Sequence, residues 1–422
     1  MRVGIISLGC ARNLVDSEQL LGRINQKGFE IVDIDCADVA IVNTCAFIQE
    51  ATEESLDIIF ELLELKKKGK LKKIIVAGCL PQRYKQELYP NLKGVDCFVG
   101  KLSLNNGKLN PTYKLTPRHF SYVKICEGCV NKCSYCVIPK IKGPFTSREI
   151  SSIVDEVKRL DQERVVEINL IGQDITSYGM DLYKKPKLTH LLKEILKSTQ
   201  NFKWLRLIYT HPSHIEDSLI EIIKNEERIV KYIDLPIQHI NDKILRMMNR
   251  KVTKKYLLSL IEKLRKEIPS IAIRTSLIVG FPGETDQNFK ELLNFIEEIK
   301  FERLGVFIYS REKETPAYNF QGHLPEKIKK ERFDILMQQQ QKISQGINAC
   351  FMGKEMEILI DTEDVDKKLG PEENIYLGRT YADAPEVDGI VYVYAKKKHI
   401  PGEFVKVRIK DTLEYDLVGE EL

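Results

Sequence analysis

The first hundred residues alternate short apolar runs with stretches of helical spacing. The apolar runs are continuous rather than alternating, which is typical of strands buried on both faces; they cover residues 3–7, 39–43 and 74–77. Between them, residues 14–27 and 50–68 repeat apolar positions with the period of a helix. Strands that alternate with helices predict an open parallel α/β sheet for residues 1–100.

A longer middle segment, residues 119–348, repeats the strand–helix pattern six times. Its strand candidates are Tyr122–Ile125, Val165–Ile171, Trp204–Tyr209, Tyr232–Leu235, Ala272–Val279 and Leu304–Tyr309. Six such units predict a partial (β/α)6 barrel, in which the chemistry lies at the carboxyl ends of the strands. A long helix is expected over residues 325–347. Residues 101–118, which precede the segment, are polar and turn-rich and are expected to form a linker.

After Gly353 the pattern changes to short alternating runs separated by glycine and proline. These runs cover residues 357–360, 391–394 and 404–408. Alternation of this kind predicts a small antiparallel β-barrel for residues 354–422. The fold class is therefore α/β, with an open α/β domain, a partial barrel and a small C-terminal barrel in that order.

Composition and charge limit the function. The chain has 422 residues, of which 43% are hydrophobic, and no uncharged stretch is long enough for a membrane span. With ten cysteines and no signal peptide, a cytoplasmic location and metal or redox chemistry are expected, with no membrane partner. Residues 354–422 hold 10 Lys and Arg against 17 Asp and Glu, a net charge of −7. An acidic barrel repels RNA and favours a basic protein partner. The alternative is that the acidic surface only aids solubility.

Cys129, Cys133 and Cys136 form a C-x3-C-x2-C motif in the loop after the first strand of the middle segment. Three thiolates leave one iron of a four-iron cluster open to an outside ligand, which is how a catalyst differs from an electron carrier. Cys126 extends the motif to a C-x2-C pair, which also raises the alternative of zinc. Only three residues separate the two pairs, too few for a zinc ribbon. Cys126 is expected to end a buried strand as a small apolar residue.

Three further cysteines each follow a predicted strand of the first segment. These are Cys10 in Ser-Leu-Gly-Cys, Cys45 in Asn-Thr-Cys and Cys79 in Ala-Gly-Cys. Because ligands gather at the carboxyl ends of parallel strands, the three thiols are expected to converge on a second cluster. Buried structural cysteines are the alternative, and Cys36 and Cys97 are expected to be of that kind.

Two loops at the carboxyl ends of barrel strands offer polar and flexible backbone groups. Gly280 to Glu284 lets the backbone approach a ligand closely, and Gly172-Gln173-Asp174 offers an amide and a carboxylate. Either run alone is also compatible with an ordinary turn. His211 and His239 follow strands as well, but such histidines are more often structural, so neither is assigned to the site.

The whole pattern resembles the methylthiotransferases, a branch of the radical S-adenosylmethionine (SAM) enzymes. The likeness covers nearly the whole chain and rests on residues 7–18, 140–148, 234–239, 278–285 and 378–389, besides the cysteines. The last stretch is typical of the branch that modifies an aspartate of a ribosomal protein. The resemblance implies an N-terminal cluster domain, a radical SAM barrel and a C-terminal TRAM barrel.

The resemblance also implies cofactors and residue roles. Two [4Fe–4S] clusters would be held, one by Cys10, Cys45 and Cys79, and the other, which binds SAM, by Cys129, Cys133 and Cys136. Residues that would help to hold SAM are Tyr135, Gln173, Gly280, Phe281, Pro282, Gly283 and Glu284. A SAM-derived radical would remove hydrogen from the β-carbon of an aspartate in the twelfth small-subunit ribosomal protein, which then takes up a methylthio group. A reducing electron donor and a sulfur donor are implied as partners.

Three other functions fit parts of the pattern. A tRNA adenosine methylthiotransferase shares the clusters and the barrel, but would be expected to carry a basic C-terminal barrel. A two-cluster electron carrier would need a fourth cysteine for each cluster. A zinc-dependent nucleic-acid-binding module would contain zinc and no iron.

Overall fold

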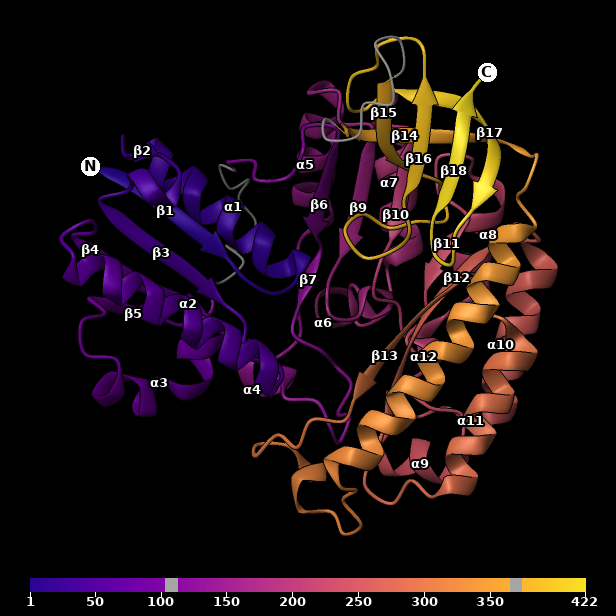
Figure 1. The fold of residues 1–422 in the computed structure, drawn as a ribbon, viewed down its shortest axis with the longest axis horizontal. Coiled ribbons are helices and arrows are strands. Elements are labelled where there is room, and N and C mark those ends of the chain that lie inside the picture. The colour runs from indigo at the N-terminus through magenta and orange to yellow at the C-terminus, as the bar shows by residue number, and fades with distance from the viewer. Residues whose placement is uncertain (103–112, 365–373) are drawn as a thin grey trace.

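The chain folds into three parts that follow one another in sequence (Figure 1). The computed structural model describes residues 1–102, 113–364 and 374–422. Much of the linker expected at residues 101–118 therefore lies outside the described residues. In the described ranges, no helix combines the length and the apolar character that a bilayer crossing needs.

The N-terminal part is a five-stranded parallel sheet in the order β2-β1-β3-β4-β5. Its strands are β1 (Arg2–Ser7), β2 (Glu30–Ile31), β3 (Val39–Thr44), β4 (Lys73–Gly78) and β5 (Cys97–Val99). The sheet is accompanied by η1 (Ile34–Cys36), α1 (Ala11–Gln26), α2 (Gln49–Lys67) and α3 (Cys79–Asn91). The three predicted strands are the central ones. The edge strands β2 and β5 were not predicted, because two or three residues are too few to show a hydrophobic pattern.

Cys36 and Cys97 are not buried, so the expectation that both are buried structural cysteines is wrong. Cys36 is the last residue of the short helix η1, and Cys97 is the first residue of the edge strand β5. An edge strand with one face in solvent exposes alternate side chains, which places Cys97 in water.

The middle part consists of two three-stranded parallel sheets, β10-β9-β6 and β11-β12-β13. Their strands are β6 (Phe120–Lys124), β9 (Glu167–Ile171), β10 (Trp204–Leu207), β11 (Tyr232–Asp234), β12 (Ala272–Val279) and β13 (Arg303–Ile308). A parallel bridge between Leu205 and Ile229 joins the two sheets. Six parallel strands that follow one another in chain order confirm the predicted partial barrel.

The helices of the middle part follow its strands. The longer ones are α5 (Ile150–Gln162), α7 (Leu188–Ser198), α8 (Asp217–Asn225), α10 (Lys254–Glu267), α11 (Asp286–Ile299) and α12 (Glu326–Ala349). Short elements in the loops are β7 (Cys126–Glu127), α4 (Ile138–Lys142), β8 (Thr146–Ser147), η2 (Ile175–Ser177), α6 (Met180–Tyr183), η3 (Pro212–His214), α9 (Asp242–Met247) and η4 (Pro316–Asn319). Helix α12 runs along the outside of the strands toward the C-terminal barrel (Figure 1).

The C-terminal part is a closed barrel in the order β14-β15-β16-β18-β17. Its strands are β14 (Glu355–Glu363), β15 (Asn374–Arg379), β16 (Val391–Ala395), β17 (Phe404–Thr412) and β18 (Leu417–Glu421). The small barrel is as predicted, except that it is not wholly antiparallel. Strands β16 and β18 pair in parallel, because β17 is the long return strand between them and pairs with both β14 and β18.

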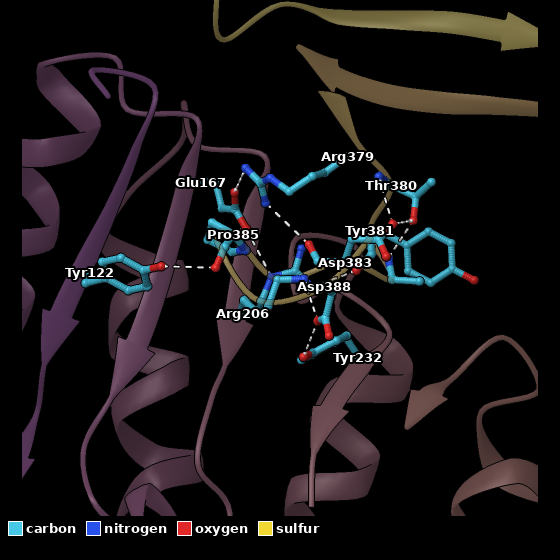
Figure 2. Close-up of polar contacts among 12 residues, drawn as sticks. Tyr122, Glu167, Arg206, Tyr232, Arg379, Thr380, Tyr381, Asp383, Pro385 and Asp388 are labelled. Carbon is cyan, nitrogen blue, oxygen red and sulfur yellow. Dashed lines mark hydrogen bonds and ion pairs between the residues drawn. The ribbon is translucent and has the colours of Figure 1, made fainter. Parts of the chain in front are cut away.

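A loop of the C-terminal barrel, residues 380–388, packs against the strands of the middle part from their amino-terminal ends (Figure 2). Arg379 and Arg206 both bind the fully buried Glu167, at 2.8 and 3.0 Å. Burial alone would raise the pKa of Glu167, but the two guanidinium charges hold it below its usual value. Trp204, the one tryptophan of the chain, lies edge-on to Phe404 with ring centroids 5.0 Å apart.

We expect Glu167→Gln to weaken this boundary strongly, because it removes the one carboxylate of the described residues that pairs with Arg206 and one of the two that pair with Arg379. The predicted loss is about 3–5 kcal/mol of unfolding free energy. Urea titration followed by Trp204 fluorescence measures it, since that ring lies at the boundary. The matched control is Glu357→Gln, which removes the exposed ion pair with Lys203 and should cost less than about 1 kcal/mol. Equal shifts for the two variants would contradict the prediction.

Candidate functional site

Cys10, Cys45 and Cys79 follow three neighbouring strands at one edge of the N-terminal sheet. The register places Ser7, Asn43 and Ala77 side by side on β1, β3 and β4, and each cysteine comes two or three residues later. Cys10 caps α1 and Cys79 begins α3, so both thiols lie at helix N-termini. The three cysteines therefore occupy one edge of the sheet, as predicted; their role as cluster ligands stays a prediction.

Glycine and asparagine hold these three loops close together. Gly9 has a φ of +86°, and a Cβ on it would lie 3.0 Å from the Sγ of Cys45. Asn13 donates from Nδ2 to the carbonyls of Leu8 and Thr44, each at 3.0 Å, and its Oδ1 lies 3.8 Å from the Sγ of Cys79. One amide side chain thus connects all three cysteine loops.

The three thiols differ in acidity. Burial alone would raise the pKa of Cys10, but the charge of Arg12 and its hydrogen bond to Sγ (Nε to Sγ, 3.3 Å) lower it to about 7. Burial raises the pKa of Cys45 to about 11, and that of Cys79 also lies above its usual value. Cys10 is therefore the thiol of this set that ionises most readily.

The second set of cysteines lies in the loop between β7 and α4, at the carboxyl end of the first barrel strand. The end of α9 fixes this loop, because Ser134 donates from N to the carbonyl of Met248 at 3.0 Å. Asn131 donates from its backbone and side chain to the Sγ of Cys129, at 3.4 and 3.6 Å. Arg250 approaches the Sγ of Cys133 at 3.9 Å. Burial raises the pKa of Cys129 and Cys136 to about 11 and about 12.

Asp174 orients the Asn131 side chain that contacts Cys129. The buried carboxylate accepts from Asn131 Nδ2, Ser177 Oγ and His214 Nδ1 at 2.8 to 2.9 Å. Burial alone would raise the pKa of Asp174, but the hydrogen bond from His214 and the neighbouring imidazoles lower it to about 2. The carboxylate therefore stays ionised, and it positions the side chain that donates to a candidate ligand.

Cys126 is fully buried, which confirms its predicted place as a small apolar residue. Its Sγ lies 3.6 Å from the carbonyl oxygen of Asp174, and a Cβ on Gly172 would lie only 2.4 Å from it. Burial, with the nearby charge of Asp174, raises the pKa of Cys126 well above its usual value. The thiol stays protonated and packs under the Gly172–Asp174 loop.

The residues expected to hold SAM form two groups: Gln173 by itself, and Tyr135 together with the Gly280–Glu284 loop. The side-chain amide of Gln173 is buried, with no hydrogen-bond partner for either polar atom, which suits a polar ligand. Tyr135 packs against the apolar cluster that contains Phe281, and Glu284 accepts from the N–H of Gly280 at 3.2 Å. Phe281, Pro282 and Glu284 are buried, whereas Gly283 is half-buried and presents its backbone. Contact of all these residues with SAM stays a prediction.

Four buried charges join the N-terminal sheet to the barrel. Asp16 of α1 pairs with Lys124 of β6 and, at 3.3 Å, with Lys142 of α4. Glu127 lies 3.8 Å from Lys124 and 3.4 Å from Lys142. Burial alone would lower the pKa of Lys142, but Asp16, together with the nearby cysteines and Glu127, raises it. We call these four residues the junction cluster.

Arg12 connects the two cysteine sets. It donates from Nε to Cys10 and from Nη1 to the carbonyl of Gly172 at 3.0 Å, and its guanidinium lies 4.3 Å from the ring centroid of Tyr209. Its positive charge also acts to lower the pKa of Cys45 in the first set and of Cys136 in the second. Arg12 therefore lies between the sets.

The donor chemistry fits iron–sulfur clusters, because each set supplies three thiols and leaves one coordination position open. Within the described ranges, no three Cys, His, Asp or Glu side chains lie close enough to hold a single metal ion. A four-iron cluster binds each thiolate through a different iron, so its ligands stand farther apart than those of one ion.

Sequence reasoning missed the side chains that support the cysteines. Three of them follow Cys10 within six residues: Arg12, Asn13 and Asp16. Their spacing along a predicted helix was the signal that could have placed them near this cysteine. Asn131 lies inside the C-x3-C-x2-C motif itself. No local pattern marks Tyr209, because its contact is with Arg12, which belongs to the N-terminal part of the chain.

In cluster-free protein we expect Cys10 to be alkylated at a lower pH than Cys45. The thiolate is the reactive form, so the rate at Cys10 should fall below its pKa of about 7, whereas Cys45 should need a pH near 11. Iodoacetamide labelling across pH, with mass spectrometry of each cysteine peptide, measures both midpoints. Coincident midpoints would contradict the predicted effect of Arg12.

Comparison with known proteins assigns each part of the chain. A model described as uncharacterized protein family UPF0004 matches residues 2–100, the radical SAM superfamily matches residues 123–296, and the TRAM domain matches residues 352–421. The radical SAM methyltransferase TsrM from Kitasatospora setae has a similar fold, with a TM-score of 0.56 over 81% of this chain and 89% of that one. Its sequence identity is 13%, so this likeness concerns the fold alone.

Relatives of the same name match the chain from end to end. The ribosomal protein uS12 methylthiotransferase RimO of Clostridioides difficile is 44% identical over 100% of this chain and 99% of its own length. The protein of the same name from Desulforamulus reducens is 46% identical over 99% of both chains. With such identity along its whole length, the chain belongs to the RimO family of methylthiotransferases, within the radical SAM superfamily.

Proposed function

We propose that this protein adds a methylthio group to the β-carbon of an aspartate in ribosomal protein uS12. The observation that carries the proposal is the pair of cysteine sets, which lie at the carboxyl ends of two parallel sheets with Arg12 between them. Relatives named for uS12 match the whole chain, which favours this substrate over a tRNA adenosine.

The proposal assigns one iron–sulfur cluster to each cysteine set. Cys129, Cys133 and Cys136 hold the cluster that binds SAM, and Cys10, Cys45 and Cys79 hold the auxiliary cluster. When bound, these groups supply a radical that removes hydrogen from carbon and a methylated sulfur that the carbon accepts. The buried amide of Gln173 and the Gly280–Glu284 loop are assigned to SAM.

The chain's own residues set the conditions for this chemistry. Asn131 and Arg250 direct N–H groups at Cys129 and Cys133, and such hydrogen bonds to the sulfurs tune the potential of a cluster. The junction cluster joins the N-terminal part, which carries Cys10, Cys45 and Cys79, to strand β6, which precedes the loop with the other three cysteines. A reducing electron donor and a sulfur donor complete the reaction, and uS12 is the basic partner of the C-terminal barrel.

We expect the two cysteine sets to fail in different ways. Cys129→Ala should abolish both SAM cleavage and methylthiolation, because the SAM-binding cluster is lost. Cys10→Ala should retain SAM cleavage and lose methylthiolation of uS12. Anaerobic assays of reconstituted protein with SAM, reductant and sulfide, read by mass spectrometry of uS12 and of 5′-deoxyadenosine, measure both activities.

The matched control is Cys97→Ala, which removes an exposed cysteine outside both sets and should leave both activities unchanged. A tRNA offered in a parallel assay tests the alternative substrate. Modified tRNA with unmodified uS12 would overturn the assignment of substrate. Intact SAM in the presence of two well-formed clusters would overturn the reaction itself.

A further inference from the structure

The position of Arg12 in the first turn of α1 is electrostatically unusual. The amino-terminal end of a helix carries partial positive charge and favours acidic side chains, and α1 has none in its first turn. Arg12 nevertheless places a second positive charge there. The arrangement makes the space between the two cysteine sets strongly attractive to an anion.

The guanidinium of Arg12 is held in place but not neutralised. Its Nε and Nη1 bind the Sγ of Cys10 and the carbonyl of Gly172, while Nη2 has no hydrogen-bond partner among the described residues. No carboxylate of the described ranges lies within ion-pair distance of it, and the side chain is half-buried. The buried cation Lys142 nearby differs in this respect, because it pairs with Asp16 and Glu127.

The ring beneath Arg12 is fixed by a chain of contacts that begins in the C-terminal barrel. Tyr209 has a φ of +68°, and its N–H donates to Asp234 Oδ2 at 2.9 Å. Arg274 lies 3.2 Å from Asp234 and 3.3 Å from Asp388 of the 380–388 loop. Figure 2 shows Asp388 pointing toward Tyr232, whose hydroxyl donates to it at 2.8 Å. The guanidinium therefore stacks on a preorganised surface.

We propose that Arg12 binds the side-chain carboxylate of the substrate aspartate and so selects aspartate as the residue to be modified. The inference rests on the proposed function, in which hydrogen leaves the β-carbon toward one cysteine set and sulfur arrives from the other. That carbon must lie between the sets, and its carboxylate carbon is one bond of about 1.5 Å away. A guanidinium fork is the side chain best matched to a carboxylate.

Arg250 is the other arginine in this region without a carboxylate partner. It binds the carbonyl of Pro236 and lies 3.9 Å from the Sγ of Cys133, inside the loop assigned to SAM. Among the described residues, neither of these two contacts reaches the N-terminal sheet. Arg12 alone of the two touches residues of both parts, Cys10 on one side and Gly172 on the other.

The test compares uS12 that carries aspartate at the modified position with uS12 that carries asparagine there. Holoenzyme variants Arg12→Gln and Arg12→Lys are compared with the unchanged protein for binding of both forms and for kcat/KM. We expect Arg12→Gln to weaken binding of the aspartate form about 10- to 100-fold and of the asparagine form little. The preference for aspartate should then fall toward 1, and Arg12→Lys should restore part of it.

Two controls separate recognition from cluster assembly. Iron content should be unchanged in Arg12→Gln, as should SAM cleavage without uS12 and the electron paramagnetic resonance spectrum of the reduced cluster on Cys129, Cys133 and Cys136, whose thiols Arg12 does not contact. Lys27→Gln removes an exposed cation from the far end of the same helix and should alter neither binding nor preference.

The outcomes distinguish this inference from the function on which it rests. Equal losses for the aspartate and asparagine forms, or altered cluster spectra with an unchanged preference, would mean that Arg12 supports the Cys10 cluster instead and would overturn the inference alone. If the unchanged holoenzyme neither binds nor modifies uS12, the proposed function fails, and the role of Arg12 fails with it.

Discussion

The junction cluster is the contact on which the geometry of the site depends. The two cysteine sets belong to different sheets, so their separation is fixed only by how these sheets dock. Asp16 and Glu127 share the ammonium groups of Lys124 and Lys142 in a fully buried arrangement. Removal of one member of such a group costs about 3–5 kcal/mol, because a buried charge is left uncompensated. Lys142 also lies near Cys10 and Cys79, which ties the docking contact to the candidate ligands.

The positions of the six cysteines could be predicted because they follow from topology. Parallel strands end at one edge of a sheet, so a cysteine after each strand must lie at that edge wherever the helices pack. The burial of a lone cysteine does not follow from topology, and the prediction for Cys36 and Cys97 was wrong for this reason. Each lies in an element of three residues, η1 or β5, which is too short to leave a periodic signal.

The roles of supporting side chains required the assembled structure. Asn13 and Arg12 lie in a recognisable motif, yet their contacts reach Thr44 and Gly172, which lie far away in sequence. The net charge of −7 for residues 354–422 also overstates the acidic surface that the C-terminal barrel offers to a basic partner. Asp383 and Asp388 pair with arginines of the middle part at 2.8 and 3.3 Å, so they are not available to a partner. Net charge counts such residues with the same weight as exposed ones.

The 380–388 loop limits how freely the C-terminal barrel can be exchanged between relatives. Arg206, Arg274 and Arg303 belong to the middle part, but their contacts run to this loop and to Glu167. A chimaera that brings in another TRAM barrel without the loop would remove the Tyr381 carbonyl from Arg206, Asp388 from Arg274 and Asp383 from Arg303, so each guanidinium group would lose a partner. Recombination at residue 352, where the TRAM match begins, therefore needs compensating changes in three distant strands. In evolution, the barrel and the loop's arginine partners should be inherited as one unit.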